Sequence, residues 1–578
     1  MPAPTRGLTA RWTLPDPEST PGSLLDRVLT KRGYATAQDR DHFLQAKFND
    51  LPSPEALPGC TAAATRILKA LRDGTPITIY GDFDVDGITA TAILWHTFRA
   101  IAPDADVDWY IPHRLDEGYG LNAEALASLA EAGRKLIITV DCGVTAVDEA
   151  AAAAALGLEL IITDHHTLHA DDPIPQATAI VHPALPNDPY SFSALAGAGV
   201  AWKLALLTAR LHDNADKLGP ALKPVLMDAL SLAAMGTVAD VMPLIGENRS
   251  IVRVGLWHMA HCGNHGIQAL LTACVKYGEQ VDAEAVGYRI GPRLNAAGRL
   301  GHASEAVELL TTAKGDQATA LAKSLTKQNE VRQNLVSALL VEADAAAQAA
   351  GMTGPDKRII VLAGHDERWH RGVLGIACSR LVETYQRPVI LLRRDGDVIG
   401  GSGRSVPGLS MYDALQHCND LLQRWGGHHM AAGLSLDRAN LDAFVERITA
   451  WVNERLSEGE LLAEVIVDCT AIKGDLTLRS IQALDALRPM GRGNERPCVL
   501  VRDAVVRQPR LFGKASDHLG LKLDTSDGLI DTVWWRGAEH LDQLAEGVRV
   551  DAVACPIVDT WRTRRPRLVI EDVAVLSG

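Results

Sequence analysis

The stretch 77-ITIYGDFDVDGITATA-92 constrains the fold of this chain more than any other part of the sequence. An apolar run ends there in three aspartates at alternate positions, Asp82, Asp84 and Asp86, and Gly87 then leads into a predicted helix. Carboxylates this close together repel one another, so a fold keeps them together only if a positive charge compensates. Two interpretations are open: a solvated acidic turn, or a metal site at the carboxyl end of a buried strand.

Apolar runs and Ala/Leu-rich helical segments alternate from Pro76 to about Leu244, which predicts a mostly parallel sheet. The predicted strands are 77–82, 107–112, 135–141, 158–164 and 178–183. Three of them end in potential ligands, at Asp82, at Asp141 and at 164-DHH-166. Because parallel strands bring their carboxyl ends to one edge of a sheet, these side chains are expected to meet there. A solvated turn does not explain that coincidence.

A further candidate ligand is Asp240, which lies in 236-GTVADVMPL-244 after a helix predicted to end near Ala233. Taken alone, an aspartate in an apolar setting is more often a cap or a turn residue. Beside the other motifs, Asp240 becomes a candidate last ligand.

Mixed carboxylate and imidazole ligands suit Mn²⁺ or a similar ion, whereas oxygen-only sites favour Mg²⁺ or Ca²⁺ and cysteine-rich sites favour zinc. Five or more ligands are too many for one ion that keeps positions open for substrate. Two ions bridged by a shared carboxylate, most naturally Asp141, would use them all. Such a pair activates a water and stabilises charge on a phosphoryl group. The predicted reaction class is metal-assisted hydrolysis of a phosphate ester or anhydride.

Four motifs in order, DxDxDG, DCG, DHH and GTVAD, resemble those of the DHH phosphoesterase superfamily. Other stretches resemble the RecJ single-strand-specific exonucleases; these are 114-RLDEGYGLN-122, 196-AGAGVAWKL-204, 289-RIGPRLNAAGRL-300, 368-RWHRGVLGIACSRL-381, 400-GGSGRSVPGLSMYDAL-415, 426-GGHHMAAG-433 and 488-RPMGRGNERP-497. The resemblance runs from about residue 76 into the C-terminal region.

The resemblance implies a two-metal site and a site for the 5′ end of a DNA strand. The candidate ligands of the two divalent ions, Mn²⁺ or Mg²⁺, are Asp84, Asp86, Asp141, His165 and Asp240, and Asp82 and His166 are expected either as further ligands or as direct partners of the ligands. Asp141, His165 and His166 are also candidate catalytic residues, with His428 beside the scissile phosphate. Asp164 is expected to orient a histidine. Arg114, Arg293, Ser402 and Arg404 are the implied contacts to the 5′-phosphate and the first nucleotides, although an ordinary surface ion pair is the alternative for each arginine.

The rest of the chain predicts a helical connector, a second α/β unit and a barrel. Residues 305–350 are rich in helix formers, and the second unit begins with a strand at 358–364. Within that unit, 400-GGSGRS-405 is predicted to be a glycine-rich turn whose backbone N–H groups suit a phosphate. The short β-like runs predicted in the C-terminal region are 464–469, 498–506, 519–523, 531–535, 548–558 and 567–576.

The resemblance implies that these last strands form an oligonucleotide-binding (OB) barrel. The candidate contacts to single strands are Trp534, Trp535, Trp561, Arg562, Arg564 and Arg565. Because neighbouring strand residues face opposite sides, one tryptophan of the adjacent pair is expected to point into the barrel.

The expected architecture is an α/β fold: a DHH-type domain with a mostly parallel sheet, a long connecting helix, a second α/β (DHH-associated) domain and a C-terminal OB-like β-barrel. At 578 residues the chain exceeds a single core. The expected boundaries are an N-terminal helical extension at 1–70, the DHH domain at 71–250, the connector at 251–350, the DHH-associated domain at 351–460 and the barrel at 461–578.

The amino-acid composition excludes few classes of function. The net charge of −14 does not indicate a nucleic-acid binder, yet an acidic protein can bind a polyanion through divalent metals and a local basic groove. Nine scattered cysteines without a CxxC motif, and no apolar run long enough for a membrane helix or a signal peptide, favour a cytoplasmic protein with no membrane partner.

The predicted function is a 5′→3′ exonuclease that degrades single-stranded DNA to mononucleotides in recombination and repair. A single-strand-binding protein and a helicase are partners implied by the resemblance, which also favours a monomer. Two alternatives remain: a phosphodiesterase of the same superfamily acting on short oligonucleotides or cyclic dinucleotides (or a pyrophosphatase), and a non-catalytic single-strand-binding replication factor. The C-terminal barrel argues against the first, and the complete ligand set argues against the second.

Overall fold

The computed structural model describes residues 5–15, 21–114, 116–168, 172–186, 188, 190–276, 278–354, 356–365, 368–457, 461–560 and 563–576. They form two compact units, each considered by itself. The first unit contains 1–44, 335–488 and 496–578, and the second contains 45–334 and 489–495.

The second unit is built on a parallel sheet with the strand order β4-β3-β5-β6-β7. Its strands are β3 (Ile77–Gly81), β4 (Val107–Tyr110), β5 (Leu136–Val140), β6 (Glu159–Thr163) and β7 (Ala179–Val181). Every neighbouring pair is parallel, which confirms the five predicted strands and their direction. All residues of β3 and β5 are buried, as expected when helices cover both faces of a sheet.

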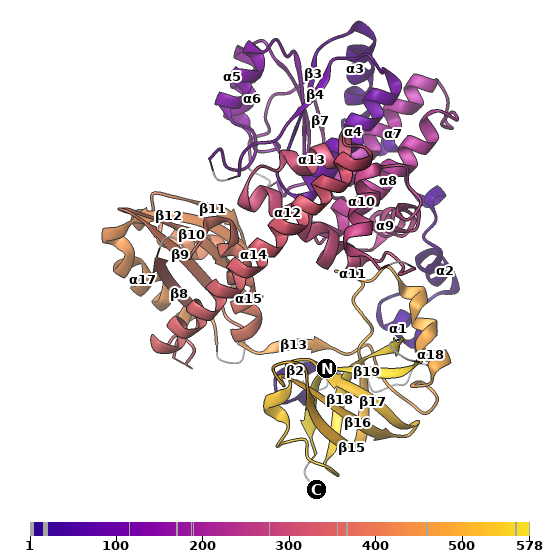
Figure 1. Cartoon of the computed structure of the whole chain (residues 1–578), viewed down its shortest axis with the longest axis vertical. Coiled ribbons are helices and arrows are strands. Elements are labelled where there is room, and N and C mark those ends of the chain that lie inside the picture. Colours follow the sequence, from indigo (N-terminus) through magenta and orange to yellow (C-terminus); the bar gives the residue numbers. More distant parts are fainter. Residues whose placement is uncertain are drawn as a thin grey trace. The chain divides into compact units, whose positions relative to one another are not determined.

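Helices cover the two faces of this sheet (Figure 1). On one face, α5 (Ala123–Glu131) and α6 (Val147–Ala155) pack against side chains such as Tyr80, Ile137 and Ile162. On the other, α3 (Cys60–Asp73), α4 (Val85–Ile101), α7 (Gly197–Asp213) and α8 (Leu222–Ala239) enclose the largest core. Two short 3-10 turns, η1 (Phe48–Asp50) and η2 (Pro54–Ala56), precede α3.

Helix α8 differs from the sequence prediction. It continues to Ala239 instead of ending near Ala233, because Gly236 packs closely against other side chains and does not break it. Asp240 therefore caps the helix instead of following it in a loop. Of the described helices, α8 alone is long and apolar enough to cross a membrane, but 61% of its apolar window is buried inside the protein, as in the core helix of a soluble protein.

A helical segment follows, as predicted for residues 305–350. Its elements are α9 (Gly246–Met259), α10 (His265–Cys274), α11 (Ala283–Ala285), the π-helical turn η3 (Val286–Ile290), α12 (Gly291–Leu300), α13 (Ser304–Thr311) and α14 (Gly315–Ala349). The long helix α14 has 35 residues.

The first unit contains a mixed sheet with the strand order β11-β12-β10-β9-β8. Its strands are β8 (Ile360–His365), β9 (Val389–Asp395), β10 (Val398–Arg404), β11 (Arg424–His428) and β12 (Ala431–Asp437). Only β8 and β9 pair in parallel. The helices beside this sheet are α15 (Arg371–Tyr385), α16 (Met411–His417) and α17 (Leu441–Arg455), with short turns η4 (Asn419–Leu421) and η5 (Arg438–Asn440).

The prediction of a glycine-rich turn at residues 400–405 is wrong. Residues 400–404 belong to strand β10, which pairs with β9 on one side and β12 on the other. A Cβ on Gly401 would lie 2.1 Å from the Leu391 carbonyl oxygen, and one on Gly403 would lie 2.9 Å from Met411 Sδ. The glycines therefore serve close packing of the strand, and its backbone N–H groups are not presented as a phosphate-binding turn.

The C-terminal strands close into a barrel. Five strands follow one another around it, in the order β15-β16-β17-β19-β18, and a β15–β18 pairing closes the ring. They are β15 (Val499–Phe512), β16 (His518–Thr525), β17 (Gly528–Trp534), β18 (Arg549–Asp559) and β19 (Arg565–Val575). Strand β14 (Cys469–Thr470) pairs with β15 in parallel. The connections contain α18 (Leu478–Ala483), η7 (Leu484–Leu487) and η8 (Ala538–His540).

The N-terminal region is only partly helical. Helices α1 (Leu24–Lys31) and α2 (Ala37–Gln45) fit the prediction, but β1 (Thr5–Arg6) and β2 (Ala10–Thr13) do not. Strand β2 pairs in parallel with β13 (Ala463–Ile466), so the run predicted at 464–469 does not form one barrel strand. The cause is a buried partner: Trp12 is fully buried and donates through Nε1 to the carboxylate of Asp572 at 2.8 Å.

Candidate metal centre

Three carboxylates follow three adjacent strands of the parallel sheet at the same edge. Asp82 follows β3, Asp141 follows β5 and Asp164 follows β6, and all three are buried. Asp141 has a φ of +62°, a left-handed backbone conformation that is uncommon outside glycine. This local strain turns the chain at the strand end and holds the Asp141 carboxylate over the rim.

Asp86 is fixed by the amino end of helix α7. Its carboxylate accepts hydrogen bonds from the backbone N–H groups of Gly197, at 2.6 Å, and Ala198, at 2.9 Å. The helix dipole favours a negative charge at this position. Close packing requires glycine here, because a Cβ on Gly197 would lie 2.7 Å from Asp141 Oδ1 and one on Gly236 would lie 2.4 Å from Asp86 Oδ1.

His165 lies at the centre of the carboxylates. Its Nε2 is 3.0 Å from Asp141 Oδ1 and 3.6 Å from both Asp86 Oδ2 and Asp240 Oδ2. Burial, together with the charge of His166, lowers the pKa of His165 to about 4. A neutral imidazole is the form that binds a metal ion.

His166 is held by Asp164. His166 Nδ1 lies 2.7 Å from Asp164 Oδ1, which also accepts from the backbone N–H groups of His165 and His166, while Oδ2 accepts from Val144 N. Burial alone would lower the pKa of His166, but the hydrogen bond and the charge of Asp164 raise it to about 9. This hydrogen bond is the contact expected if Asp164 orients a histidine; the orienting role itself stays a prediction.

Asp84 has two contacts of different kinds. As the N-cap of α4, it accepts hydrogen bonds from the backbone N–H groups of Asp86 and Gly87. It also offers an oxygen to a cluster with Asp82 and Asp141. The DxDxDG motif is therefore both a helix start and part of the rim.

The electrostatics of this rim fit a bound cation. Burial and the neighbouring carboxylates raise the pKa of Asp82, Asp86 and Asp141 well above the usual range. Burial and Asp84 likewise raise the pKa of Asp240 to about 7, against the lowering effect of His166 and Arg492. Two buried oxygens, Asp82 Oδ1 and Asp141 Oδ1, have no hydrogen-bond partner. A cation supplies the missing charge and coordination.

The ligand atoms form three overlapping clusters, each with its atoms within 4.8 Å of one another. The clusters are Asp141–His165–His166, Asp86–His165–Asp240 and Asp82–Asp84–Asp141. All seven predicted ligands are thus brought together, and Asp141 and His165 each belong to two clusters.

Two predicted substrate residues lie in the same unit. The Arg114 guanidinium carbon is 4.6 Å from the ring centroid of Phe83, which stands between two of the rim aspartates. Arg293, in α12, donates to Thr326 Oγ1 at 3.2 Å and to the Arg289 carbonyl at 2.6 Å.

The other predicted substrate residues lie in the first unit and share one face of its mixed sheet. Ala431 pairs with Arg404 on one side and with His428 on the other, so these side chains point to the same face, as does Ser402 two residues before Arg404. A groove of about 510 Å³ on this unit is lined by residues that include Ser402, Arg371 and Arg424.

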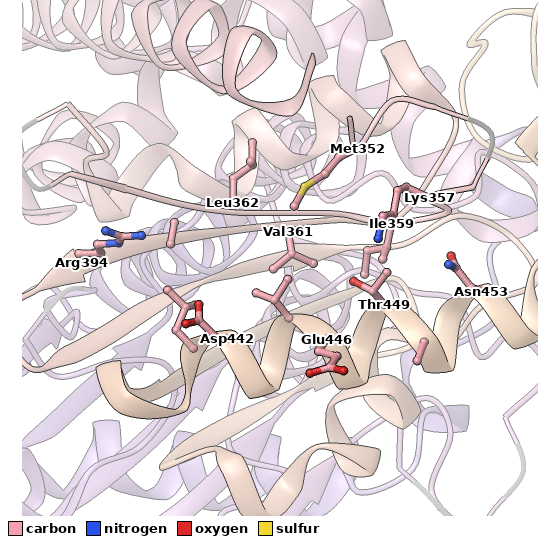
Figure 2. A pocket seen from close by; sticks show the side chains of 14 residues that line it. Met352, Lys357, Ile359, Val361, Leu362, Arg394, Asp442, Glu446, Thr449 and Asn453 are labelled. Carbon is pink, nitrogen blue, oxygen red and sulfur yellow. The ribbon is translucent and has the colours of Figure 1, made fainter. Parts of the chain in front are cut away.

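A second groove in the first unit contains none of the predicted site residues. Figure 2 shows it between β8 and helix α17, with Val361 and Ile359 facing Asp442, Glu446 and Thr449; its volume is about 620 Å³. Its charged lining has both signs, from Lys357 and Arg394 and from Asp442 and Glu446, and so offers no surface of one sign to a polyanion.

In the barrel, one tryptophan of the adjacent pair points inward, as predicted. Trp534 is 6% exposed and stacks on His540, with ring centroids 4.6 Å apart, whereas Trp535 is 55% exposed. Trp535 lies beside His518 and Phe512, at centroid distances of 4.9 and 5.8 Å. Arg565 forms ion pairs with Asp531 and Asp559. Trp561 and Arg562 lie outside the described residues.

Sequence reasoning missed two groups at the rim. The Tyr119 hydroxyl donates to the Asp141 carbonyl at 3.2 Å and lies 3.1 Å from His166 Nδ1. The amino end of α7, which holds Asp86, was also missed. Both lie in stretches that resemble the RecJ exonucleases, 114–122 and 196–204, but no local sequence pattern shows that they reach the rim.

Family models match three parts of the chain. The DHH family, N-terminal domain model matches residues 76–237, the DHHA1 domain model matches 356–454 and the RecJ OB domain model matches 467–572. With the carboxylate–imidazole rim, these matches define a metal-dependent phosphoesterase of the DHH class.

Comparison with curated relatives identifies the family within this class of phosphoesterases. The single-stranded-DNA-specific exonuclease RecJ of Bacillus subtilis (strain 168) is 37% identical over 96% of this chain and 68% of its own length. RecJ of Salmonella typhimurium is 35% identical over 95% of this chain and 95% of its own length. The chain belongs to the RecJ family of single-stranded-DNA-specific exonucleases, which confirms the predicted resemblance.

Solved structures agree with this assignment. RecJ from Thermus thermophilus in complex with Mn²⁺ has a TM-score of 0.79 at 30% identity, covering 98% of this chain and 80% of that chain. The complex of the same protein with Mg²⁺ has a TM-score of 0.74 at 29% identity, covering 98% and 79%. The predicted fold class, including the C-terminal barrel, is confirmed.

Proposed function

We propose that this protein degrades single-stranded DNA from the 5′ end to mononucleotides, using two divalent ions held at the rim. The observation that carries the proposal is the set of three overlapping ligand clusters, in which Asp141 and His165 each belong to two. The buried oxygens Asp82 Oδ1 and Asp141 Oδ1 support it, because neither accepts a hydrogen bond and a cation would offset the cost of burying them.

The proposed ligands of the two ions, Mn²⁺ or Mg²⁺, are Asp82, Asp84, Asp86, Asp141, His165, His166 and Asp240. When bound, such ions lower the pKa of a water and stabilise the charge that develops on phosphate oxygens. Asp141, shared by two clusters, is the proposed bridging carboxylate. Asp164 would keep His166 in one orientation, and the amino end of α7 would do the same for Asp86.

We propose that the strand is held by Arg114 and Arg293 from the second unit and by Ser402, Arg404 and His428 from the first. The common sheet face of the last three supports their joint role. In the barrel, the exposed ring of Trp535 suits stacking by an unpaired base.

The finer organisation is also a proposal. We retain the boundaries of an N-terminal extension (1–70), which is only partly helical, a DHH domain (71–250), a connector (251–350), a DHH-associated domain (351–460) and the barrel region (461–578). The nine cysteines are all free, which suits a reducing cytoplasm. Monomeric action in recombination and repair, with a single-strand-binding protein and a helicase as partners, rests on family resemblance.

The test uses one oligonucleotide labelled at the 5′ end and the same one labelled at the 3′ end, each incubated with the protein and Mn²⁺. The proposal predicts early release of labelled mononucleotide from the 5′-labelled strand and gradual shortening of the 3′-labelled strand. Early release from the 3′-labelled strand would refute the polarity. Cleavage restricted to di- to tetranucleotides would instead favour a short-substrate phosphodiesterase.

A further inference from the structure

Residues 489–495, which we call the Arg492 turn, belong to the second unit, although the chain on either side groups with the first. Gly491 and Asn494 exchange two backbone hydrogen bonds of 3.0 Å. Asn494 Nδ2 and Arg249 Nη1 both donate to the Pro489 carbonyl, at 2.7 and 3.3 Å. Asn494 and Arg249 are each 1% exposed, so the base of the turn is firmly held in the second unit.

The Arg492 turn packs on residues 241–244, which form the corner that follows Asp240. Leu244 N donates to the Arg492 carbonyl at 2.7 Å. A Cβ on Gly491 would lie 2.7 Å from Leu244 Cδ1, so the backbone approaches this closely only with glycine. The position of Arg492 is therefore set by backbone contacts and does not depend on its own side chain.

The corner itself is strained. Val241 has a φ of +57°, which is unusual for a β-branched residue, and its side chain is 59% exposed. Arg492 Nη1 lies 3.5 Å from the Val241 carbonyl oxygen, and the positive charge of Arg492 acts on the neighbouring Asp240 carboxylate. The exposed guanidinium thus stands at the edge of the rim.

Among the described residues, no carboxylate lies within ion-pair distance of Arg492, and the long contact to the Val241 carbonyl occupies one of its five donors. Where the rim holds divalent cations, a further positive charge beside them is unfavourable unless an anion lies between. A phosphodiester is such an anion, and a guanidinium binds its oxygens through charge-assisted hydrogen bonds.

We propose that Arg492 is a further substrate-binding residue, whose guanidinium contacts a phosphate of the DNA strand at the rim beside Asp240. The inference rests on the proposed function, because it assumes that the strand crosses this rim. The rival role is structural: the Arg492 side chain would only steady the Asp240 corner through Val241.

The test compares the wild-type protein with Arg492→Met and Arg492→Lys on a 5′-phosphorylated oligothymidylate. Two quantities are measured across a range of salt concentrations: kcat/KM for hydrolysis in Mn²⁺, and equilibrium binding in metal-free buffer by fluorescence anisotropy. Arg66→Met is the matched control, because Arg66 pairs with Glu159 at the opposite, amino end of strand β6.

For Arg492→Met, loss of one phosphate contact should reduce the slope of log affinity against log salt by about 0.7. Loss of one charge-assisted hydrogen bond should raise KM by about tenfold or more. We expect kcat and the Mn²⁺ concentration for half-maximal activity to stay within about twofold of wild type, since the metal ligands are untouched. Arg492→Lys should retain the slope, and Arg66→Met should match wild type throughout.

A wild-type salt slope in Arg492→Met would overturn the inference. A higher Mn²⁺ requirement with an unchanged slope would overturn it as well, in favour of the structural role. The proposed function fails separately: if the wild-type protein binds the oligonucleotide but does not hydrolyse it, the binding slopes still decide the role of Arg492.

Discussion

Asp164→Asn should destabilise the protein and raise its metal requirement. The carboxylate accepts hydrogen bonds at both oxygens, from His166 Nδ1 and two backbone N–H groups at Oδ1 and from Val144 N at Oδ2. An amide turns one of these acceptors into a donor, so a buried N–H loses its partner at a cost of about 1–3 kcal/mol.

The loss of negative charge adds a second effect through His166. Against the lowering effect of burial, the hydrogen bond and charge of Asp164, followed by the charges of Asp240 and Asp82, raise the pKa of His166 from 6.5 to about 9. At about 1.4 kcal/mol per pH unit this gives an upper limit of about 3.5 kcal/mol, and we take about 2 because the imidazole is partly exposed. Because the folded pKa is raised, this contribution is fully present below pH 6.5 and is lost as the pH rises through about 9.

Thermal unfolding of the metal-free protein measures the sum of these two losses of stability, from the hydrogen bond and from the charge. A destabilisation of about 3–5 kcal/mol near pH 6.5 should lower the Tm of the second unit by roughly 8 °C, and the difference from wild type should shrink above pH 9. Loss of the partner that orients His166 should raise the Mn²⁺ concentration for half-maximal hydrolysis by about 10–100-fold.

Asp228→Asn is the matched control. Asp228 also pairs with a histidine in the same unit, at 2.7 Å from His258 Nε2, and accepts from a backbone N–H, but it belongs to none of the ligand clusters. It should lower stability by about 1 kcal/mol without changing the Mn²⁺ requirement. If Asp164→Asn and Asp228→Asn change the Mn²⁺ requirement equally, the orienting role of Asp164 is refuted.

Two other perturbations follow from the same packing. Gly236→Ala places a Cβ 2.4 Å from Asp86 Oδ1 and should displace that carboxylate. We expect the free energy of unfolding in urea to fall by about 1–3 kcal/mol and kcat to fall at least tenfold. An unchanged kcat would contradict the close packing at Gly236. Trp535→Ala should weaken single-strand binding by about 1–3 kcal/mol in fluorescence anisotropy at unchanged Tm. Trp534→Ala should instead destabilise the barrel by about 3–5 kcal/mol, and the reverse pattern would contradict the assigned orientations.

The sequence predicted the parallel sheet and the clustered ligands because both depend on local patterns. Strands β3, β5 and β6 are short apolar runs, and each ends directly in an aspartate. Once the strands are parallel, their carboxyl ends share an edge without any further information. The inward turn of one residue of the pair Trp534–Trp535 followed from strand alternation in the same way.

The features that sequence reasoning missed depend on contacts between distant segments. Strand β2 forms because Trp12 reaches Asp572, 560 positions along the chain. The glycines of β10 resemble a turn locally, but they serve close packing against Leu391 and Met411. Asp86 was expected as a ligand, yet the helix end that fixes it comes from Gly197, 111 positions away. No local pattern encodes such pairs.

The most direct test of the metal-centre account is Asp141→Ala, assayed for Mn²⁺-dependent hydrolysis of a single-stranded oligonucleotide and, in parallel, for binding of the same oligonucleotide. Asp141 belongs to two ligand clusters, so its removal should abolish hydrolysis. Binding should be largely retained, because the proposed strand contacts lie on other residues. Full hydrolytic activity in Asp141→Ala would contradict the assignment of this rim as the catalytic metal centre.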